Sequence, residues 1–165
     1  MTQRFFKNLF GHVQSLGESI FFFGKIVSLI FRGRVRWNDV LIQMYDQGVQ
    51  TVIIVILTSF ATGTVLGLQG YITLQRFGAK EFIARLVALS LLRELSPVFT
   101  SLIFSGKAGA GITAELGTMN TQDQIQATRA MGVDPLEYLV VPRFLACFFV
   151  LPVLVVISEI FGIAG

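Results

Sequence analysis

The sequence has few of the residues that form disulfide frameworks, metal centres and water-soluble surfaces. It contains one cysteine, Cys147, and one histidine, His12. A single cysteine excludes an intramolecular disulfide, and a single histidine excludes a metal site made of several histidines. Charged residues make up only 14% of the chain, against roughly 25% in ordinary globular domains. A soluble protein of this size would need more charge to cover its surface.

Apolar residues dominate what is present. They account for 53% of the 165 residues, and 16 of these residues are phenylalanines. This composition excludes intrinsic disorder, because disordered segments are depleted in aromatic and aliphatic residues. We therefore expect the lipid bilayer to be the solvent of this chain.

Three segments are apolar and long enough to cross a bilayer, whose core needs about 20 helical residues. The first is residues 49–68, inside a stretch without charge, and the second runs from about residue 82 to residue 108. The third begins near Val140 and is still apolar at Gly165. The predicted fold class is an all-α membrane protein, and the unfinished third segment indicates the first part of a longer chain.

Residues 1–36 predict an amphipathic helix at the membrane interface together with a basic linker. The linker begins at residue 32 and extends to residue 38. Six basic residues stand against one acidic residue in 1–36, and three against one in 69–85. The positive-inside rule places the N-terminus in the cytoplasm. A signal peptide is the alternative, but Lys25 interrupts its apolar core. The apolar residues at helical spacing are Phe5, Phe6, Leu9, Phe10, Val13, Leu16 and Ile20.

Small residues share one face of the first segment. Ser59, Gly63 and Gly67 are spaced four residues apart, a pattern that lets two helix backbones approach closely. This face predicts packing within the chain or, alternatively, a contact between two copies.

Charged residues inside the second segment are the most informative feature. Arg93 and Glu94 would cost about 3 kcal/mol each in the bilayer centre, so each should face a partner or a wet cavity. Pro97 removes the hydrogen bond to the carbonyl of Arg93 and should kink the helix there. We expect a polar element in a substrate cavity; a structural ion pair is the alternative. Glu159, in the third segment, is a possible partner of Arg93 or Lys107.

A short cytoplasmic helix is predicted at residues 121–131. Thr121 and Gln124 form a capping box, and Asp123 adds favourable charge to the first turn. Gly132 should end this helix, and Asp134 should cap the next one, which begins with proline. A docking element for a soluble partner and a plain connection both fit this pattern.

The remaining motifs argue against an enzyme or a nucleotide-binding chain. The run at residues 106–111 is glycine-rich, but Ala108 stands where a phosphate loop needs Ser or Thr. We expect no catalytic site, no metal site and no nucleic-acid binding. His12 should be solvated, and Cys147 should behave as a small apolar residue.

Several motifs in a specific order resemble the MlaE/YrbE family, the permease subunits of MCE-type lipid ABC transporters. They are TGTVLGLQ at 62–69, LRELSPV at 92–98, AELGTM at 114–119, DQI at 123–125, MGVDP at 131–135 and VPR at 141–143. The resemblance runs from about residue 10 to the last residue. Family members have five membrane helices after an interfacial helix, so this chain would lack the last two.

The resemblance implies a function that composition alone does not. It implies a homodimeric permease domain at residues 37–165 in the bacterial inner membrane. It also implies a cytoplasmic ATPase that binds ATP and Mg, a periplasmic ring of MCE proteins and often a STAS-domain protein. Such complexes move phospholipid between inner and outer membranes and maintain outer-membrane lipid asymmetry; some relatives handle sterols or other lipids. The alternative hypotheses are a non-transporting membrane scaffold and an integral-membrane lipid enzyme.

The resemblance also assigns residues to roles. The family's ATPase-coupling helix matches residues 121–131. Its lipid-facing positions match the pair in the second segment and the residues around it. The implied coupling residues are Glu115, Thr121, Asp123, Gln124 and Arg129, and the implied lipid contacts are Leu66, Phe77, Arg93, Glu94, Leu95 and Pro97.

Overall fold

The computed structural model describes residues 2–31, 35–75 and 82–165, and every element in these residues is helical. This confirms the all-α fold class. Three helical stretches are long and apolar enough to cross a membrane, at residues 37–75, 84–121 and 136–164. Phe77 lies outside the described residues, and so does part of the predicted linker, at residues 32–34. The side chains of residues 2–16, including His12, are also outside them.

All three membrane helices are longer than the apolar segments that predicted them. The first, α2, is Trp37–Gln75. The second consists of α3 (Ile83–Ser90), a π-helical turn η2 (Leu91–Leu95) and α4 (Ser96–Thr121). The third consists of a π-helical turn η3 (Leu136–Val140) and α6 (Val141–Ala164). Hydropathy marks only the part of a helix within hydrocarbon, whereas the backbone hydrogen bonds continue into the polar regions.

Both π-helical turns end immediately before an X-Pro pair. The amide of Ser96 donates to the carbonyl of Leu91, one residue before Pro97. The amide of Val141 donates in the same way to Leu136, before Pro142. A proline ring clashes with the carbonyl four residues earlier, and a wider turn relieves that clash. The kink predicted at Pro97 is therefore a π-helical turn, and the helix continues through it.

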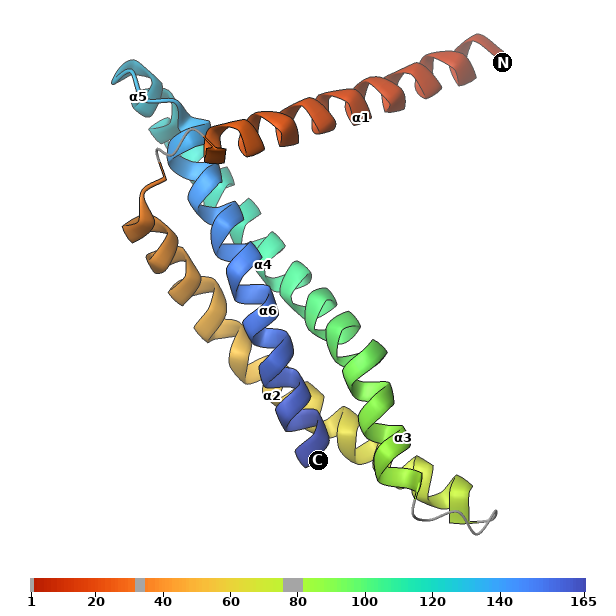
Figure 1. The fold of residues 1–165 in the computed structure, drawn as a ribbon. Helices are drawn as coiled ribbons and strands as arrows, with labels where there is room; N and C mark the ends of the chain where they lie inside the picture. Colours follow the sequence, from red (N-terminus) through yellow and green to blue (C-terminus); the bar gives the residue numbers. More distant parts are fainter. Residues whose placement is uncertain (1, 32–34, 76–81) are drawn as a thin grey trace.

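The helices α2, α4 and α6 run side by side as an elongated bundle (Figure 1). Its core is formed by Val55 of α2, Phe104 of α4, and Val150 and Leu154 of α6. Most large apolar side chains point outward instead, as in a protein whose surroundings are apolar. The bundle therefore holds together through a narrow core between long helices.

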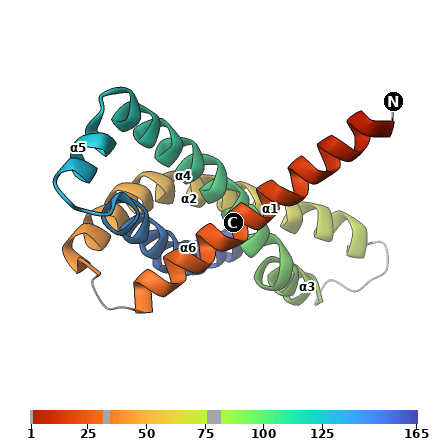
Figure 2. The same ribbon diagram turned by 90° about the horizontal axis from the view of Figure 1, so that it is seen from above.

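Helix α1 (Thr2–Phe31) leaves the bundle at a steep angle, near α5 (Figure 1). Seen from above, it runs across the end of the bundle (Figure 2). Buried Ile26 and an edge-to-face contact between Phe23 and Phe144, with centroids 5.6 Å apart, fix its C-terminal part. A helix crossing the bundle in this way is compatible with the predicted interfacial position, which stays a prediction.

The short cytoplasmic helix predicted at residues 121–131 is shorter in the structure. Helix α5 spans Gln124–Ala130, and Thr121 is the last residue of α4. The capping box is wrong, because the hydroxyl of Thr121 donates to the carbonyl of Thr118 at 2.9 Å. Thr121 therefore belongs to the last turn of α4, and Asp123 is the residue immediately before α5.

Candidate functional site

The turn into α5 carries the residues predicted to contact an ATPase. Asp123, Gln124 and Arg129 are exposed. Asp123 has a φ of 56°, the one positive φ among the described non-glycine residues. Its left-handed backbone reverses the chain between α4 and α5, and Figure 2 shows α5 at the edge of the bundle. The ATPase contact itself stays a prediction.

Two caps close the segment from α5 to the third membrane helix, and both predictions are confirmed. Gly132 has a φ of 78° and its amide donates to Arg129 at 2.9 Å, while the amide of Val133 donates to Thr128 at 3.3 Å. These bonds form a Schellman motif. Asp134 Oδ1 then accepts the amide of Leu136 at 3.0 Å. The first cap ends α5 and the second begins the third membrane helix, whereas the N-terminus of α5 has no side-chain cap.

The same segment is tied to α1. Asp134 Oδ2 lies 3.6 Å from Lys25 Nζ. Both side chains are partly exposed, so the ion pair contributes modestly to stability. It nevertheless places the end of α1 directly beside the loop that follows α5.

An ion pair joins α4 to α6 just below α5. Arg143 Nη2 lies 2.7 Å from Glu115 Oε1. The Arg143 side chain is 5% exposed and that of Glu115 is 47% exposed. Nε and Nη1 of Arg143 have no hydrogen-bond partner. Glu115, predicted as an ATPase contact, therefore points to α6 and binds an arginine there.

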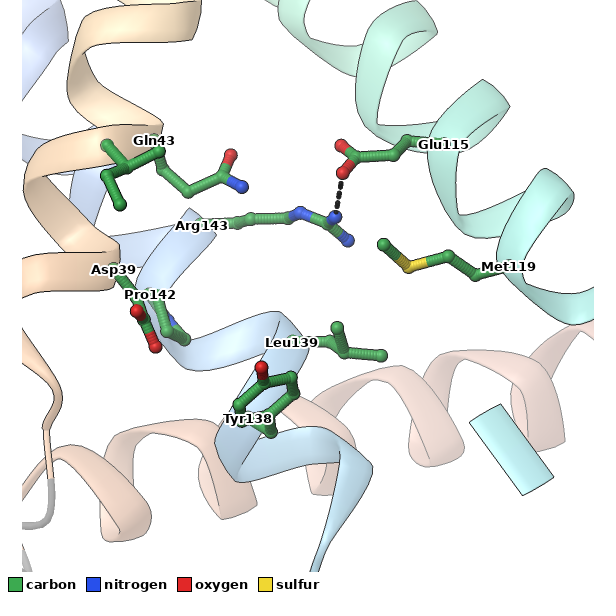
Figure 3. A pocket seen from close by; sticks show the side chains of 9 residues that line it. Asp39, Gln43, Glu115, Met119, Tyr138, Leu139, Pro142 and Arg143 are labelled. Carbon is green, nitrogen blue, oxygen red and sulfur yellow. Dashed lines mark ion pairs between the residues drawn. The ribbon is translucent and has the colours of Figure 1, made fainter. Parts of the chain in front are cut away.

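Two adjoining cavities surround this ion pair. The first, of about 190 Å³, is lined by residues that include Asp39, Gln43, Glu115, Tyr138 and Arg143 (Figure 3). The second, of about 160 Å³, shares Gln43 and Glu115 with it and continues along α2 and α4 to Lys107. Charged and amide side chains thus line two neighbouring cavities, the first between all three membrane helices and the second between α2 and α4.

Further polar contacts hold the helices together deeper in the bundle. Lys107 Nζ donates to the carbonyl of Gln50. The thiol of Cys147 donates to Gln47 Oε1 at 3.0 Å, so it is more than the small apolar residue predicted. No described group of three or more histidine, cysteine, aspartate or glutamate residues could hold a metal ion.

Apolar cavities lie toward the other end of the bundle. Leu66 lines a cavity of about 250 Å³ between α2 and α3, together with Leu86 and Val87. A cavity of about 370 Å³ beside it is lined by Gly67, Val87 and the last residues of α6. Leu95 borders a space of only about 10 Å³. Spaces lined mainly by apolar groups suit acyl chains, but the predicted lipid contacts stay predictions.

Arg93 and Glu94 lie on the η2 turn, and both are exposed. Among the described residues they form no ion pair with each other, and Glu159 pairs with neither Arg93 nor Lys107. They line none of the cavities above. Their exposure leaves both side chains available to a neighbouring molecule, and their role stays a prediction.

The small-residue face of α2 meets α6. Ser59 Oγ and Ser158 Oγ are 2.7 Å apart in the buried contact. A Cβ on Gly63 would overlap the carbonyl of Gly162, whereas a Cβ on Gly67 would meet nothing within 4 Å. Of the two possibilities that the sequence left open, the structure therefore places packing within the chain at Ser59 and Gly63.

The segment that forms the three membrane helices, with a short helix between the second and third, also matches a known protein family in sequence. The family described as Permease MlaE matches residues 40–165. The chain belongs to the MlaE permease family. The resemblance inferred from the motifs is thereby confirmed.

Relatives of this MlaE-family chain cover it almost completely. The intermembrane phospholipid transport system permease protein MlaE of Haemophilus influenzae is 41% identical over 96% of this chain and 61% of its own length. A probable ABC transporter permease protein of Rickettsia conorii is 40% identical over 92% of this chain and 59% of its own length. Protein TRIGALACTOSYLDIACYLGLYCEROL 1, chloroplastic, of Arabidopsis thaliana is 35% identical over 86% and 41%. The chain spans about three-fifths of the length of the two bacterial relatives.

The residue that sequence reasoning missed in this MlaE-family chain is Arg143. It appeared only as part of a family motif. Its signal was present, since it is the one basic residue between residues 136 and 165, and a charge inside an apolar span needs a partner. That the partner is Glu115, 28 residues earlier, required the structure.

Proposed function

We propose that this chain is the membrane-spanning permease part of an ABC transporter that moves phospholipid. The observation that carries the proposal is the match of residues 40–165 to the MlaE permease family. The name of the Haemophilus relative, an intermembrane phospholipid transport permease, supports phospholipid as the cargo. The apolar cavities beside Leu66 and Gly67 offer space of the right character for acyl chains.

The proposed mechanism divides the work between two chains. A cytoplasmic ATPase binds ATP and Mg and contacts the α4–α5 turn through Asp123, Gln124 and Arg129. Because α5 ends in a Schellman motif and only a short turn separates it from the third membrane helix, a push on α5 would move α4 and α6 together. Two copies of the permease would enclose an apolar cavity, with Arg93 and Glu94 near the lipid headgroup or its path.

The wider assembly that we propose rests on the family resemblance. We propose a homodimer in the bacterial inner membrane with a cytoplasmic N-terminus and a periplasmic ring of MCE proteins. A STAS-domain protein would accompany the ATPase. The complex would exchange phospholipid between inner and outer membranes and so maintain outer-membrane lipid asymmetry. The ion pair of Lys25 with Asp134, which ties α1 to the α5 loop, supports a common cytoplasmic side for both.

The test uses the complete complex reconstituted in vesicles that contain radiolabelled phospholipid. We expect transfer of the label to acceptor vesicles that depends on ATP and stops with a hydrolysis-deficient ATPase partner. Assembly of the full complex without any ATP-dependent transfer would contradict the proposal and favour a membrane scaffold.

A further inference from the structure

We propose that the two adjoining polar cavities between α2, α4 and α6 bind the headgroup of an amine-bearing zwitterionic phospholipid. The phosphate would bind at Arg143 and the ammonium group at Asp46. The role of this site as a step in transport rests on the function proposed above, whereas its binding chemistry does not require transport.

The first observation is a buried cation with free donors. Arg143 is 4% exposed, and its Nε and Nη1 have no partner while Nη2 binds Glu115. Figure 3 shows the guanidinium group in the cavity, between the side chains of Gln43, Glu115 and Met119. Unpaired buried donors are costly, and phosphate oxygens are among the acceptors that guanidinium groups bind best. A phosphate in this cavity would give the guanidinium group a second anionic partner.

The second observation is the balance of charge around the two cavities. Lys107 and Arg143 are their basic residues, and Asp39, Asp46 and Glu115 are their acidic residues. Arg36, which pairs with Asp39, brings the count to three cations and three carboxylates, so a ligand with only negative charge would add unbalanced charge. A ligand that also carries a cation is favoured.

The position of that cation follows from which carboxylates already have partners. Asp39 pairs with Arg36 at 3.2 Å, and Glu115 pairs with Arg143. Asp46 is the one acidic residue of these cavities that forms no ion pair with the described residues. A primary ammonium group can donate hydrogen bonds to this carboxylate, whereas the trimethylammonium group of choline cannot.

Depth and size both fit a headgroup. The residues that line the cavities belong to the end of the bundle from which α1 departs (Figure 1). Exposed Tyr138 lines the first cavity, and exposed Trp37 precedes the lining residue Asp39 by two positions. Tryptophan and tyrosine gather at the headgroup level of membranes. Volumes of about 190 and 160 Å³ are small beside the 300–1,000 Å³ or so of typical ligand pockets. The acyl chains would therefore remain in the bilayer, along exposed apolar residues of α2 such as Ile42 and Val49.

The test measures lipid retention by the complete complex without ATP. The complex is placed in nanodiscs with equal amounts of phosphatidylethanolamine, phosphatidylglycerol and phosphatidylcholine of identical acyl chains. Tightly bound lipid is then identified by native mass spectrometry. We expect phosphatidylethanolamine to be retained over both other lipids.

Two variants separate the two halves of the site. Asp46→Asn should lower the preference for phosphatidylethanolamine over phosphatidylcholine by about tenfold, the loss of one charge-assisted hydrogen bond. Arg143→Lys should weaken retention of both zwitterionic lipids. Glu137→Gln is the matched control, because Glu137 lies at the same end of the bundle but lines neither cavity. Asp46 is exposed, so its variant should fold.

Three results would overturn the proposal: equal retention of all three lipids, preferred retention of phosphatidylglycerol, or an unchanged preference in Asp46→Asn. Binding of soluble phosphoethanolamine by delipidated complex, without any lipid preference, would assign the cavities to a free metabolite instead. Because ATP is absent, a complex that retains phosphatidylethanolamine but fails to transport would overturn the proposed function and leave this site intact.

Discussion

Gly63 is a residue at which the bundle has no room for a side chain. Its Cα faces the backbone of Gly162, and any Cβ there would overlap the Gly162 carbonyl. Backbone cannot yield as a flexible side chain can, so the two helices would have to separate. Close approach of this kind is how small residues stabilise helix pairs in membranes, where the hydrophobic effect between helices is weak.

We predict that Gly63→Ala lowers the unfolding free energy by about 1–3 kcal/mol, the usual range for overpacking. A thermal melt of the complex in detergent would show this as a lower Tm. Gly67→Ala is the matched control, because it lies on the same helix face with nothing within 4 Å of a Cβ. An equal effect of both substitutions would contradict the close contact at Gly63.

The ion pair of Glu115 with Arg143 is asymmetric in burial, and this predicts an asymmetric response. Arg143→Met leaves a half-exposed carboxylate that water can reach, whereas Glu115→Ala leaves a buried guanidinium without a counterion. Uncompensated buried charge is the costlier outcome. We therefore expect Glu115→Ala to lower the Tm more than Arg143→Met does. The reverse order would show that the pair is hydrated in the assembled protein.

Glu94 is exposed on the η2 turn, where the proposed function puts it near the lipid path. We predict that Glu94→Ala changes the amount or the type of lipid that copurifies with the complex, measured by lipid mass spectrometry. The Tm should change little, because the side chain has no ion pair with the described residues. If the copurified lipid were unchanged and the Tm were lower, Glu94 would have a structural role instead.

At the scale of elements, α5 is a short helix between two membrane helices. Seven residues are too few for a helix to be stable alone, so its C-terminal cap and its neighbours maintain it. The Schellman motif at Gly132 and the cap at Asp134 are both local in sequence. This is why both could be predicted, whereas the start of α5 depended on how far α4 extended.

We predict that the double variant Asp123→Ala with Arg129→Ala uncouples the complex. Both side chains are exposed, so the permease should fold normally and the effect should fall on the ATPase. Copurification of the ATPase should drop, or lipid-stimulated ATP hydrolysis should disappear. Normal assembly together with normal lipid transfer in this variant would remove α5 from the coupling path.

The sequence predicted where the second membrane helix is disturbed but not that the disturbance is a π-helical turn. Pro97 and the charged pair before it predicted a local disturbance of the second membrane helix. The disturbance is a widened turn at Leu91–Leu95, and a similar turn at Leu136–Val140 precedes Pro142. A proline can be accommodated by a kink, a break or a wider turn. The choice depends on the neighbouring helices, which sequence does not place.

At the scale of the whole molecule, the bundle is apolar on the outside and has a narrow core. Exposed apolar residues are spread along α2, α4 and α6, so the bilayer or a second protein surface must cover them. Because Ser59 and Gly63 already contact α6, the proposed homodimer must use another face. We predict two permease copies per complex by native mass spectrometry, and the same number in Gly63→Ala. Loss of the second copy in that variant would contradict this assignment.

The sequence alone determined the fold class, the three membrane helices, the family and the caps at Gly132 and Asp134. All of these depend on periodicity, composition or contacts between residues close in the chain. The tertiary structure alone decided that Glu115 binds Arg143, that Ser59 meets Ser158, and that polar cavities form beside α6. Those contacts join residues far apart in sequence. Helical spacing tells which side chains share a face, but only the packing of the helices decides which face meets which.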